Sequence, residues 1–332
     1  MTRAMLRQTF LNNAGWAEAL QTPLAGDAST RSYIRLERGA DRAMLMDAPP
    51  ETGQDVGPFV AIAEHLENLE LSPPEIFAQD RDNGFLLLED LGDNLFARLL
   101  LDRATSELDL YRAASDVLLK IQSAQTPKNI PEFGVKEMAE ATDLAALWYC
   151  QTEDPSALVE FVRDVLTRTA GSCNVLVLRD YHAENLIWLP FRTGAARVGL
   201  LDFQDAVLGH PAYDLASLLN DARRDVSPLV KDAVLNRFVA KQGEDSATFR
   251  AAFHAISAQR NLRILGIFAR LCLRDSKPHY IDFIPRVWAN LMTDLAHPAV
   301  SELQGFVLST FPVPTHDILE DLRARCGTAQ RQ

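Results

Sequence analysis

Three polar residues stand at the ends of apolar stretches, where buried strands are expected. Asp180 follows the apolar residues 175–178, Asn185 comes five positions later, and Asp202 ends a second run over 198–201. A carboxylate in such a place must be paired, hydrogen-bonded or bound to a metal. Phosphoryl transfer needs one carboxylate that accepts the proton of an attacking hydroxyl, and oxygen ligands that hold Mg²⁺ on a triphosphate. The spacing fits that chemistry; the alternative is that Asp180 and Asn185 are turn or cap residues.

The elements around these residues fall into a β-rich first part and a helical second part. Alternation, short apolar runs and turn residues predict strands over 32–36, 43–46, 76–80, 85–89, 175–178 and 198–201. Apolar residues at helical spacing predict helices over 4–20, 59–71, 108–123, 137–150 and 157–170, with more helices from 213 onward. This order predicts an α+β fold with two lobes, residues 1–92 and 93–332.

Composition and charge narrow the partners. The chain has 332 residues, of which 47% are hydrophobic and 23% charged, and a formal net charge of −12. Such a chain repels nucleic acid and acidic membrane surfaces, so neither is an expected partner. The four cysteines are far apart and form no zinc pattern. No apolar run is long enough to span a bilayer, and a cytoplasmic location is expected. Oligomeric state is left open.

The polar segments share a longer pattern with a known family. The sequence reads D-Y-H-A-E-N-L over 180–186, L-D-F-Q-D-A over 201–206 and G-H-P-A-Y-D-L over 209–215. This resembles the aminoglycoside phosphotransferase family. The resemblance implies a protein-kinase-like two-lobed fold, with a small β-rich N-lobe and a larger, mainly helical C-lobe. It also implies ATP and Mg²⁺ as cofactors, Asp180 as the catalytic base, and Asn185 and Asp202 as metal ligands.

Two further residues match the family's supporting positions. His182 matches the second histidine of the catalytic motif, and Asp214 matches an aspartate that braces the catalytic loop. Both are expected to act as structural support. Leu178 and Arg179 replace the family's usual His-Gly pair before the catalytic aspartate, so contacts of that first histidine are not expected here.

The nucleotide side of the site departs from the usual pattern. Residues 24–33 lie where the family places its loop over the ATP phosphates, and the predicted nucleotide contacts are Gly26, Asp27, Ser29, Thr30 and Arg31. An ordinary turn is the alternative, because the segment holds a single glycine. The strand over 43–47 lacks the lysine that kinase-like folds use. Arg31 is its expected substitute, with Arg35 as the second candidate, and the alternative is that Arg31 is an exposed residue at a strand edge. The backbone of Glu89 and Leu91 is expected to meet adenine.

The acceptor is predicted from a narrower resemblance. Residues 25–31, 46–51, 87–93 and 259–266 resemble the anomeric amino-sugar kinases of bacterial cell-wall recycling, which phosphorylate N-acetylmuramate and N-acetylglucosamine. The helix expected over 256–275 carries several arginines, and Arg260 and Arg263 are predicted to contact a sugar carboxylate or acetamide. A solvated, salt-bridged helix face is the alternative. Gln204 and Asp205 are further acceptor candidates.

The predicted function is therefore ATP-dependent phosphorylation of a small molecule, with an amino-sugar hydroxyl as the favoured acceptor. Aminoglycoside antibiotics, choline and homoserine remain alternative acceptors. A nucleotide-binding scaffold related to pseudokinases is the non-enzymatic alternative, motivated by the absent lysine. The joint presence of Asp180, Asn185 and Asp202 weighs against it, because a scaffold needs no metal ligands.

Overall fold

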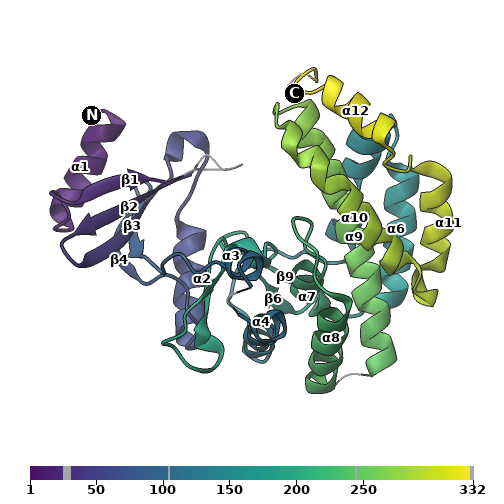
Figure 1. The fold of residues 1–332 in the computed structure, drawn as a ribbon, viewed down its shortest axis with the longest axis horizontal. Helices are drawn as coiled ribbons and strands as arrows, with labels where there is room; N and C mark the ends of the chain where they lie inside the picture. The colour runs from purple at the N-terminus through teal and green to yellow at the C-terminus, as the bar shows by residue number, and fades with distance from the viewer. Residues whose placement is uncertain (25–30, 104, 244, 330–332) are drawn as a thin grey trace. The chain divides into compact units, whose positions relative to one another are not determined.

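A computed structural model describes residues 1–24, 31–103, 105–243 and 245–329. The chain forms two compact units (Figure 1). Unit 1 comprises Met1–Ser106 and Glu184–Asp205, and unit 2 comprises Glu107–Ala183 and Ala206–Gln332. Unit 1 thus includes the later segment that carries Asn185 and Asp202. The assignment of residues 1–92 to nucleotide binding and 93–332 to the catalytic loop and acceptor stays a prediction.

Unit 1 is built on a five-stranded antiparallel sheet in the order β1-β2-β3-β5-β4. Its strands are β1 (Leu20–Pro23), β2 (Ser32–Arg38), β3 (Asp41–Asp47), β4 (Ile76–Asp80) and β5 (Phe85–Glu89). The four predicted strands in this part are confirmed. β1 was not predicted, because its four residues are largely exposed and show no alternation. Gly84 closes the β4–β5 hairpin at φ +68, where a Cβ would lie 2.0 Å from Ala48 O.

The helix α1 (Arg3–Asn13) covers this sheet (Figure 1). Phe10 and Leu11 of α1 share a buried core with Leu36 and Leu45 of the sheet. The predicted helix over 4–20 ends early, at Asn13. The helix α2 (Gly57–Asn68) agrees with the predicted helix over 59–71 within a few residues at its end.

A small hairpin in unit 1 carries the expected metal ligands at its open end. β7 (Leu186–Trp188) pairs with β8 (Val198–Leu200), with Leu186 opposite Leu200. The backbone N–H of Leu200 donates to Ser72 O at 2.9 Å, which ties the hairpin to the segment after α2. The helix α3 (Phe96–Leu101) follows the sheet in the same unit. The predicted strand over 198–201 is confirmed, whereas β7 was not predicted.

Unit 2 is mainly helical and centres on the 28-residue helix α9 (Ser246–Leu273). α9 packs against α6 (Ser156–Thr169), α7 (Ala212–Leu219), α10 (Ile284–Leu295) and α12 (His316–Ala324). The remaining α-helices described in this unit are α4 (Glu107–Gln122), α5 (Val135–Glu140), α8 (Pro228–Gln242) and α11 (Ser301–Thr310). β6 (Val175–Val177) pairs with β9 (Val207–Gly209). Within the described ranges, no helix is both long and apolar enough to cross a membrane.

The predicted continuous helix over 137–150 is wrong. α5 ends at Glu140, and a separate π-helix covers Ala145–Cys150. The intervening turn packs directly on α9, where a Cβ at Gly266 would lie 2.2 Å from the carbonyl carbon of Leu144. The close approach of two backbones, rather than helical periodicity, therefore decides the path of this segment.

Candidate active site

The loop that carries Asp180 is held by α7. Asp214 lies in the first turn of α7 and is 1% exposed. Its Oδ2 accepts from the backbone N–H of Leu178 at 2.6 Å, and its Oδ1 accepts from that of Arg179 at 2.9 Å. Burial raises the pKa of Asp214 to about 7, against the lowering effect of both N–H donors and of Arg260. These contacts support the predicted bracing role of Asp214.

Arg179, the residue before Asp180, has a left-handed backbone with φ 71. A residue with a Cβ adopts this conformation at a cost of roughly 1 kcal/mol, so surrounding contacts must hold it there. Its N–H is bound by Asp214, and its carbonyl oxygen accepts from Ser217 Oγ at 3.3 Å. Arg260 donates to the same Ser217 Oγ at 2.6 Å. α7 and α9 together therefore fix the peptide that precedes the catalytic aspartate.

The side chains after this peptide differ sharply in exposure. Asp180 is exposed, whereas Tyr181 is buried and its hydroxyl donates to Ala114 O at 2.9 Å. His182 Nε2 lies 3.2 Å from Arg223 Nη1, and burial lowers the pKa of His182 to about 4. Because a guanidinium can only donate, the neutral ring accepts at Nε2. This supports the predicted role of His182 in shaping the loop.

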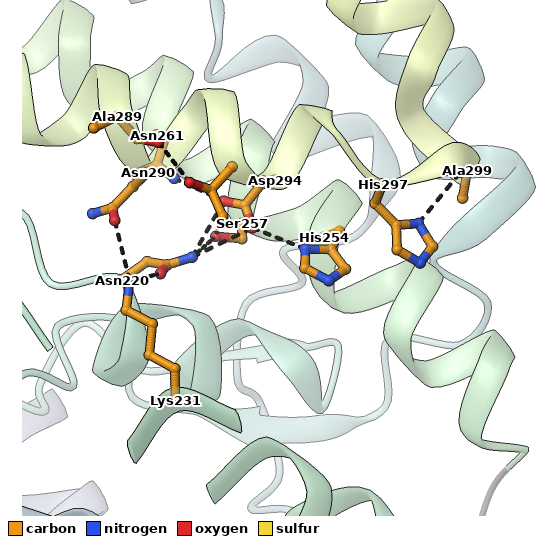
Figure 2. Close-up of polar contacts among 11 residues, drawn as sticks. Asn220, Lys231, His254, Ser257, Asn261, Ala289, Asn290, Asp294, His297 and Ala299 are labelled. Carbon is orange, nitrogen blue, oxygen red and sulfur yellow. Dashed lines mark hydrogen bonds and ion pairs between the residues drawn. The ribbon is translucent and has the colours of Figure 1, made fainter. Parts of the chain in front are cut away.

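The far end of α7 is anchored in a buried polar network (Figure 2). Asn220 directly follows α7, and its Nδ2 donates to Ser257 Oγ at 2.7 Å and to Asp294 Oδ2 at 3.2 Å. Ser257 Oγ in turn donates to Asp294 at 2.6 Å, and Lys231 Nζ donates to Asn220 Oδ1 at 2.7 Å. The helix that carries Asp214 is thus held by hydrogen bonds at both ends.

The two expected metal ligands lie together in unit 1. Asn185 precedes β7 and Asp202 follows β8, and Asn185 O accepts from Leu201 N at 3.0 Å. Asn185 Nδ2 lies 3.5 Å from Asp202 Oδ2. Asp202 has a left-handed backbone with φ 57. One carboxylate and one amide oxygen suit Mg²⁺, which keeps several waters and shares its coordination with phosphates.

In the described ranges, this pair has no larger cluster of metal-ligating side chains as a rival. Among the residues that the structure describes, no group of three or more His, Cys, Asp or Glu side chains is placed to hold an ion. Gln204 Nε2 donates to Asp202 Oδ1 at 2.8 Å and to Asp205 Oδ2 at 3.3 Å. The observed contact of Gln204, a predicted acceptor residue, is therefore with the expected metal ligand. Acceptor contacts of Gln204 and Asp205 stay a prediction.

The predicted phosphate loop lies mostly outside the described residues, which leaves Gly26, Asp27, Ser29 and Thr30 without a structural account. Arg31 is described, and its Nε donates to Gln54 Oε1 at 2.7 Å.

The end of β5, where adenine is expected, carries two ion pairs. Glu89 pairs with Arg192, and Asp90 pairs with Arg35 at 2.7 Å. Leu91 follows at the end of this strand and is half-buried. The expected adenine contacts of Glu89 and Leu91 use the main chain, which these side-chain pairs do not involve, and they stay a prediction.

The predicted acceptor arginines of α9 have unequal surroundings. Arg260 is 7% exposed, and its guanidinium lies over the Tyr213 ring, 5.1 Å from the centroid. Arg263 is half-buried and donates to the Tyr213 hydroxyl at 3.3 Å. The observed contacts of Arg260 support the catalytic loop through Ser217. Direct contact of Arg260 or Arg263 with a substrate stays a prediction.

Three supporting residues escaped the sequence prediction: Ser217, Arg223 and Asp294. The sequence contained a signal for Asp294: it lies seven positions after Val287, on the otherwise apolar face of a helix, where a charged residue needs a polar partner. Ser217 and Arg223 had none, since their contacts depend on how α7 meets a loop some forty residues earlier in the chain.

The fold and site agree with comparisons to known proteins. A sequence model of the phosphotransferase enzyme family matches residues 21–252. An N-acetylmuramate/N-acetylglucosamine kinase of Caulobacter vibrioides is 42% identical, over 94% of this chain and 98% of its own. A protein of the same description from Pseudomonas aeruginosa is 33% identical, over 90% of this chain and 91% of its own. The chain belongs to the phosphotransferase enzyme family.

Solved structures support the same fold at low sequence identity. An aminoglycoside phosphotransferase homologue of Ralstonia eutropha has a TM-score of 0.64 at 14% identity, and the match covers 90% of this chain and 98% of that chain. Choline kinase LicA of Streptococcus pneumoniae has a TM-score of 0.58 at 15% identity, with 87% and 99% covered. The predicted α+β, protein-kinase-like fold class is confirmed, as is the prediction of a phosphotransferase.

Proposed function

We propose that this enzyme transfers the γ-phosphoryl group of ATP to the anomeric hydroxyl of an N-acetylated amino sugar, N-acetylmuramate or N-acetylglucosamine. The observation that carries the proposal is the position of Asp180. Its side chain is exposed, and it directly follows Arg179, whose backbone N–H and carbonyl oxygen both hydrogen-bond to side chains of α7. A general base must be accessible to its substrate and held in one position. The relatives from Caulobacter and Pseudomonas supply the acceptor class.

Asp180 would orient the sugar hydroxyl and accept its proton as the phosphoryl group moves. Asn185 and Asp202 would hold Mg²⁺, which supplies positive charge against the phosphate oxygens when bound. Gln204 would keep the carboxylate of Asp202 in one orientation through its hydrogen bond to Oδ1. His182 and Asp214 would maintain the shape of the catalytic loop.

The nucleotide contacts come from unit 1 in this proposal. Arg31 would meet the phosphates together with the preceding segment, Gly26 to Thr30, because β3 presents no lysine there. The main chain of Glu89 and Leu91 would contact adenine. Gln204, Asp205, Arg260 and Arg263 remain the proposed acceptor residues, although the observed contacts of Arg260 favour a supporting role.

A substrate panel tests the proposal. ADP release is measured with Mg·ATP and, in separate reactions, N-acetylmuramate, N-acetylglucosamine, kanamycin, choline and homoserine. We expect turnover with the two sugars, and phosphorus NMR of the product should place the phosphate on the anomeric oxygen. Turnover with kanamycin and neither sugar would refute the acceptor class. Tight nucleotide binding without turnover on any acceptor would favour a scaffold. A cytoplasmic location, where ATP is plentiful, suits the proposal.

A further inference from the structure

Three arginines gather beside the catalytic loop on a pair of aromatic rings in unit 2. Phe133 and Tyr213 meet edge to face, with ring centroids 5.6 Å apart and an interplanar angle of 89°. The guanidinium of Arg179 lies over the Phe133 ring, 5.3 Å from its centroid, and that of Arg260 lies over Tyr213. Arg263 reaches the Tyr213 hydroxyl. We refer to Arg179, Arg260 and Arg263 as the arginine cluster.

The positive charge of this cluster is only partly offset. Within the parts of the chain that the structure describes, none of its three arginines forms an ion pair with Asp or Glu. Asp214 is the carboxyl that interacts electrostatically with Arg260, but burial raises its pKa to about 7, so it offsets the charge of Arg260 only in part. Arg179 and Arg263 are half-buried cations, and Arg179 Nε is a buried donor with no hydrogen-bond partner among the described residues. Buried donors are normally paired, so a hydrogen-bond acceptor is expected at this Nε.

The backbone of Arg179 points to a role for its side chain. Glycine occupies a left-handed position such as φ 71 without strain, whereas arginine does not. Strained conformations of this kind concentrate where a side chain has a function. The backbone N–H of Arg179 donates to Asp214, and its carbonyl oxygen accepts from Ser217. Because Asp180 is the next residue, these two hydrogen bonds anchor both the Arg179 side chain and the catalytic carboxylate.

We propose that Arg179 and Arg263, presented on the Phe133–Tyr213 rings, bind a carboxylate group of the acceptor, and that Arg179 makes the enzyme favour an acidic N-acetyl sugar over a neutral one. The inference rests on the proposed function. The inference predicts that the enzyme distinguishes the two proposed sugars, since N-acetylmuramate carries a lactyl carboxylate and N-acetylglucosamine does not. A planar guanidinium binds such a carboxylate through two parallel N–H groups.

The variant Arg179→Gly tests this directly, because glycine suits φ 71 and leaves the backbone contacts in place. We expect the KM for N-acetylmuramate to rise by roughly 10-fold or more, the size of a lost charged hydrogen bond, while the KM for N-acetylglucosamine stays within about twofold. Arg263→Gln should likewise raise the KM for N-acetylmuramate and leave the KM for N-acetylglucosamine nearly unchanged. Arg168→Ala removes a cation from an exposed ion pair on α6 and should change neither.

The substrate offers a matching test. The methyl ester of N-acetylmuramate keeps the shape of the acid and loses its charge, so the wild-type enzyme should bind it no better than N-acetylglucosamine. An Arg179→Gly enzyme that keeps its preference for the acid overturns the inference. So does an equal loss of kcat with both sugars, which would assign Arg179 to the transferred phosphoryl group instead. Wild-type protein that phosphorylates neither sugar overturns the proposed function, and this inference with it.

Discussion

Two carboxylates, Asp180 on the catalytic loop and Asp214 on α7, have opposite requirements. Asp180 must face solvent to meet a substrate. Asp214 is buried, and its two carboxyl oxygens fix the loop by accepting hydrogen bonds from two backbone N–H groups. The backbone of Arg179 is held by hydrogen bonds, and its side chain lies over the Phe133 ring. Removing the carboxylate of Asp180 should therefore lower turnover, whereas removing that of Asp214 should change stability.

For Asp180→Asn we expect kcat to fall by about 10²–10⁴-fold, because the amide cannot accept the hydroxyl proton. Nucleotide affinity and thermal stability should stay close to wild type, since the side chain is exposed. ADP release, isothermal titration with ADP and thermal unfolding measure these three quantities. Glu184→Gln, an exposed carboxylate four residues later, serves as the control and should retain activity. Near-normal turnover in Asp180→Asn would remove the assignment of this residue as the base.

The raised pKa of Asp214 predicts a pH dependence of stability. The folded protein keeps this carboxyl protonated up to about pH 7, whereas the unfolded chain loses the proton near pH 4. In between, the folded state binds more protons, so the contribution of Asp214 to the free energy of unfolding falls as the pH rises. The slope should reach up to about 1.4 kcal/mol per pH unit.

Urea unfolding of wild type and Asp214→Asn between pH 4 and 8 checks this dependence. The stability advantage of wild type should shrink up to about pH 7 and then level off, because the amide does not titrate. An advantage that is flat or grows over this range would show that the folded state holds the carboxylate charged.

At the scale of elements, α9 determines how unit 2 packs. It contacts α6, α7, α10 and α12, and it supplies Ser257 to the network around Asp294 and Arg260 to Ser217. Gly266 on α9 permits a close approach of the helix to the backbone at Leu144. Local sequence preferences do not anticipate such an approach, and the interrupted helix before Ala145 is its consequence.

Gly266→Ala should destabilise the protein by about 1–3 kcal/mol or more, because its Cβ meets backbone atoms that cannot move aside. The better helix propensity of alanine offsets at most about 1 kcal/mol of this. Gly305→Ala on α11 is the matched control, since a Cβ there has nothing within 4 Å. It should stabilise the protein slightly. Equal stability of the two variants in urea unfolding would contradict the packing argument.

At the scale of the whole molecule, the proposed chemistry divides between the two units. Unit 1 contains Asn185, Asp202 and the sheet expected to bind nucleotide, and unit 2 contains Asp180 and the arginine cluster. The formal charge of −12 makes the clustered arginines an exception to the overall balance. A nucleotide that binds the folded chain stabilises it by mass action, and Mg²⁺ should control how much.

Mg·ATP at about 100 times its Kd should stabilise wild type by about 2.7 kcal/mol, seen as a rise in melting temperature. In Asp202→Asn the added benefit of Mg²⁺ over ATP alone should be largely lost, because the amide lacks the ligand's charge. Asp205→Asn, an exposed neighbour that is not expected to bind the ion, should behave like wild type. An undiminished Mg²⁺ effect in Asp202→Asn would contradict the assignment of Asp202 as a metal ligand.

The sequence alone determined the features that depend on local spacing. Alternation located β2, apolar residues and turn residues located β3 to β5, and the interval between Asp180, Asn185 and Asp202 indicated phosphoryl transfer. Such patterns are legible because side-chain direction repeats every two residues in a strand and nearly every four in a helix.

Only the tertiary structure decided which residues touch across long separations in the chain. It placed Arg260 in the interior as a support for Ser217, broke the helix before Ala145, and fixed Arg179 in a left-handed conformation. None of these follows from local preference. Each results from packing between segments 35 to over 100 residues apart, where close contact and the pairing of buried polar groups outweigh the propensity of any single stretch.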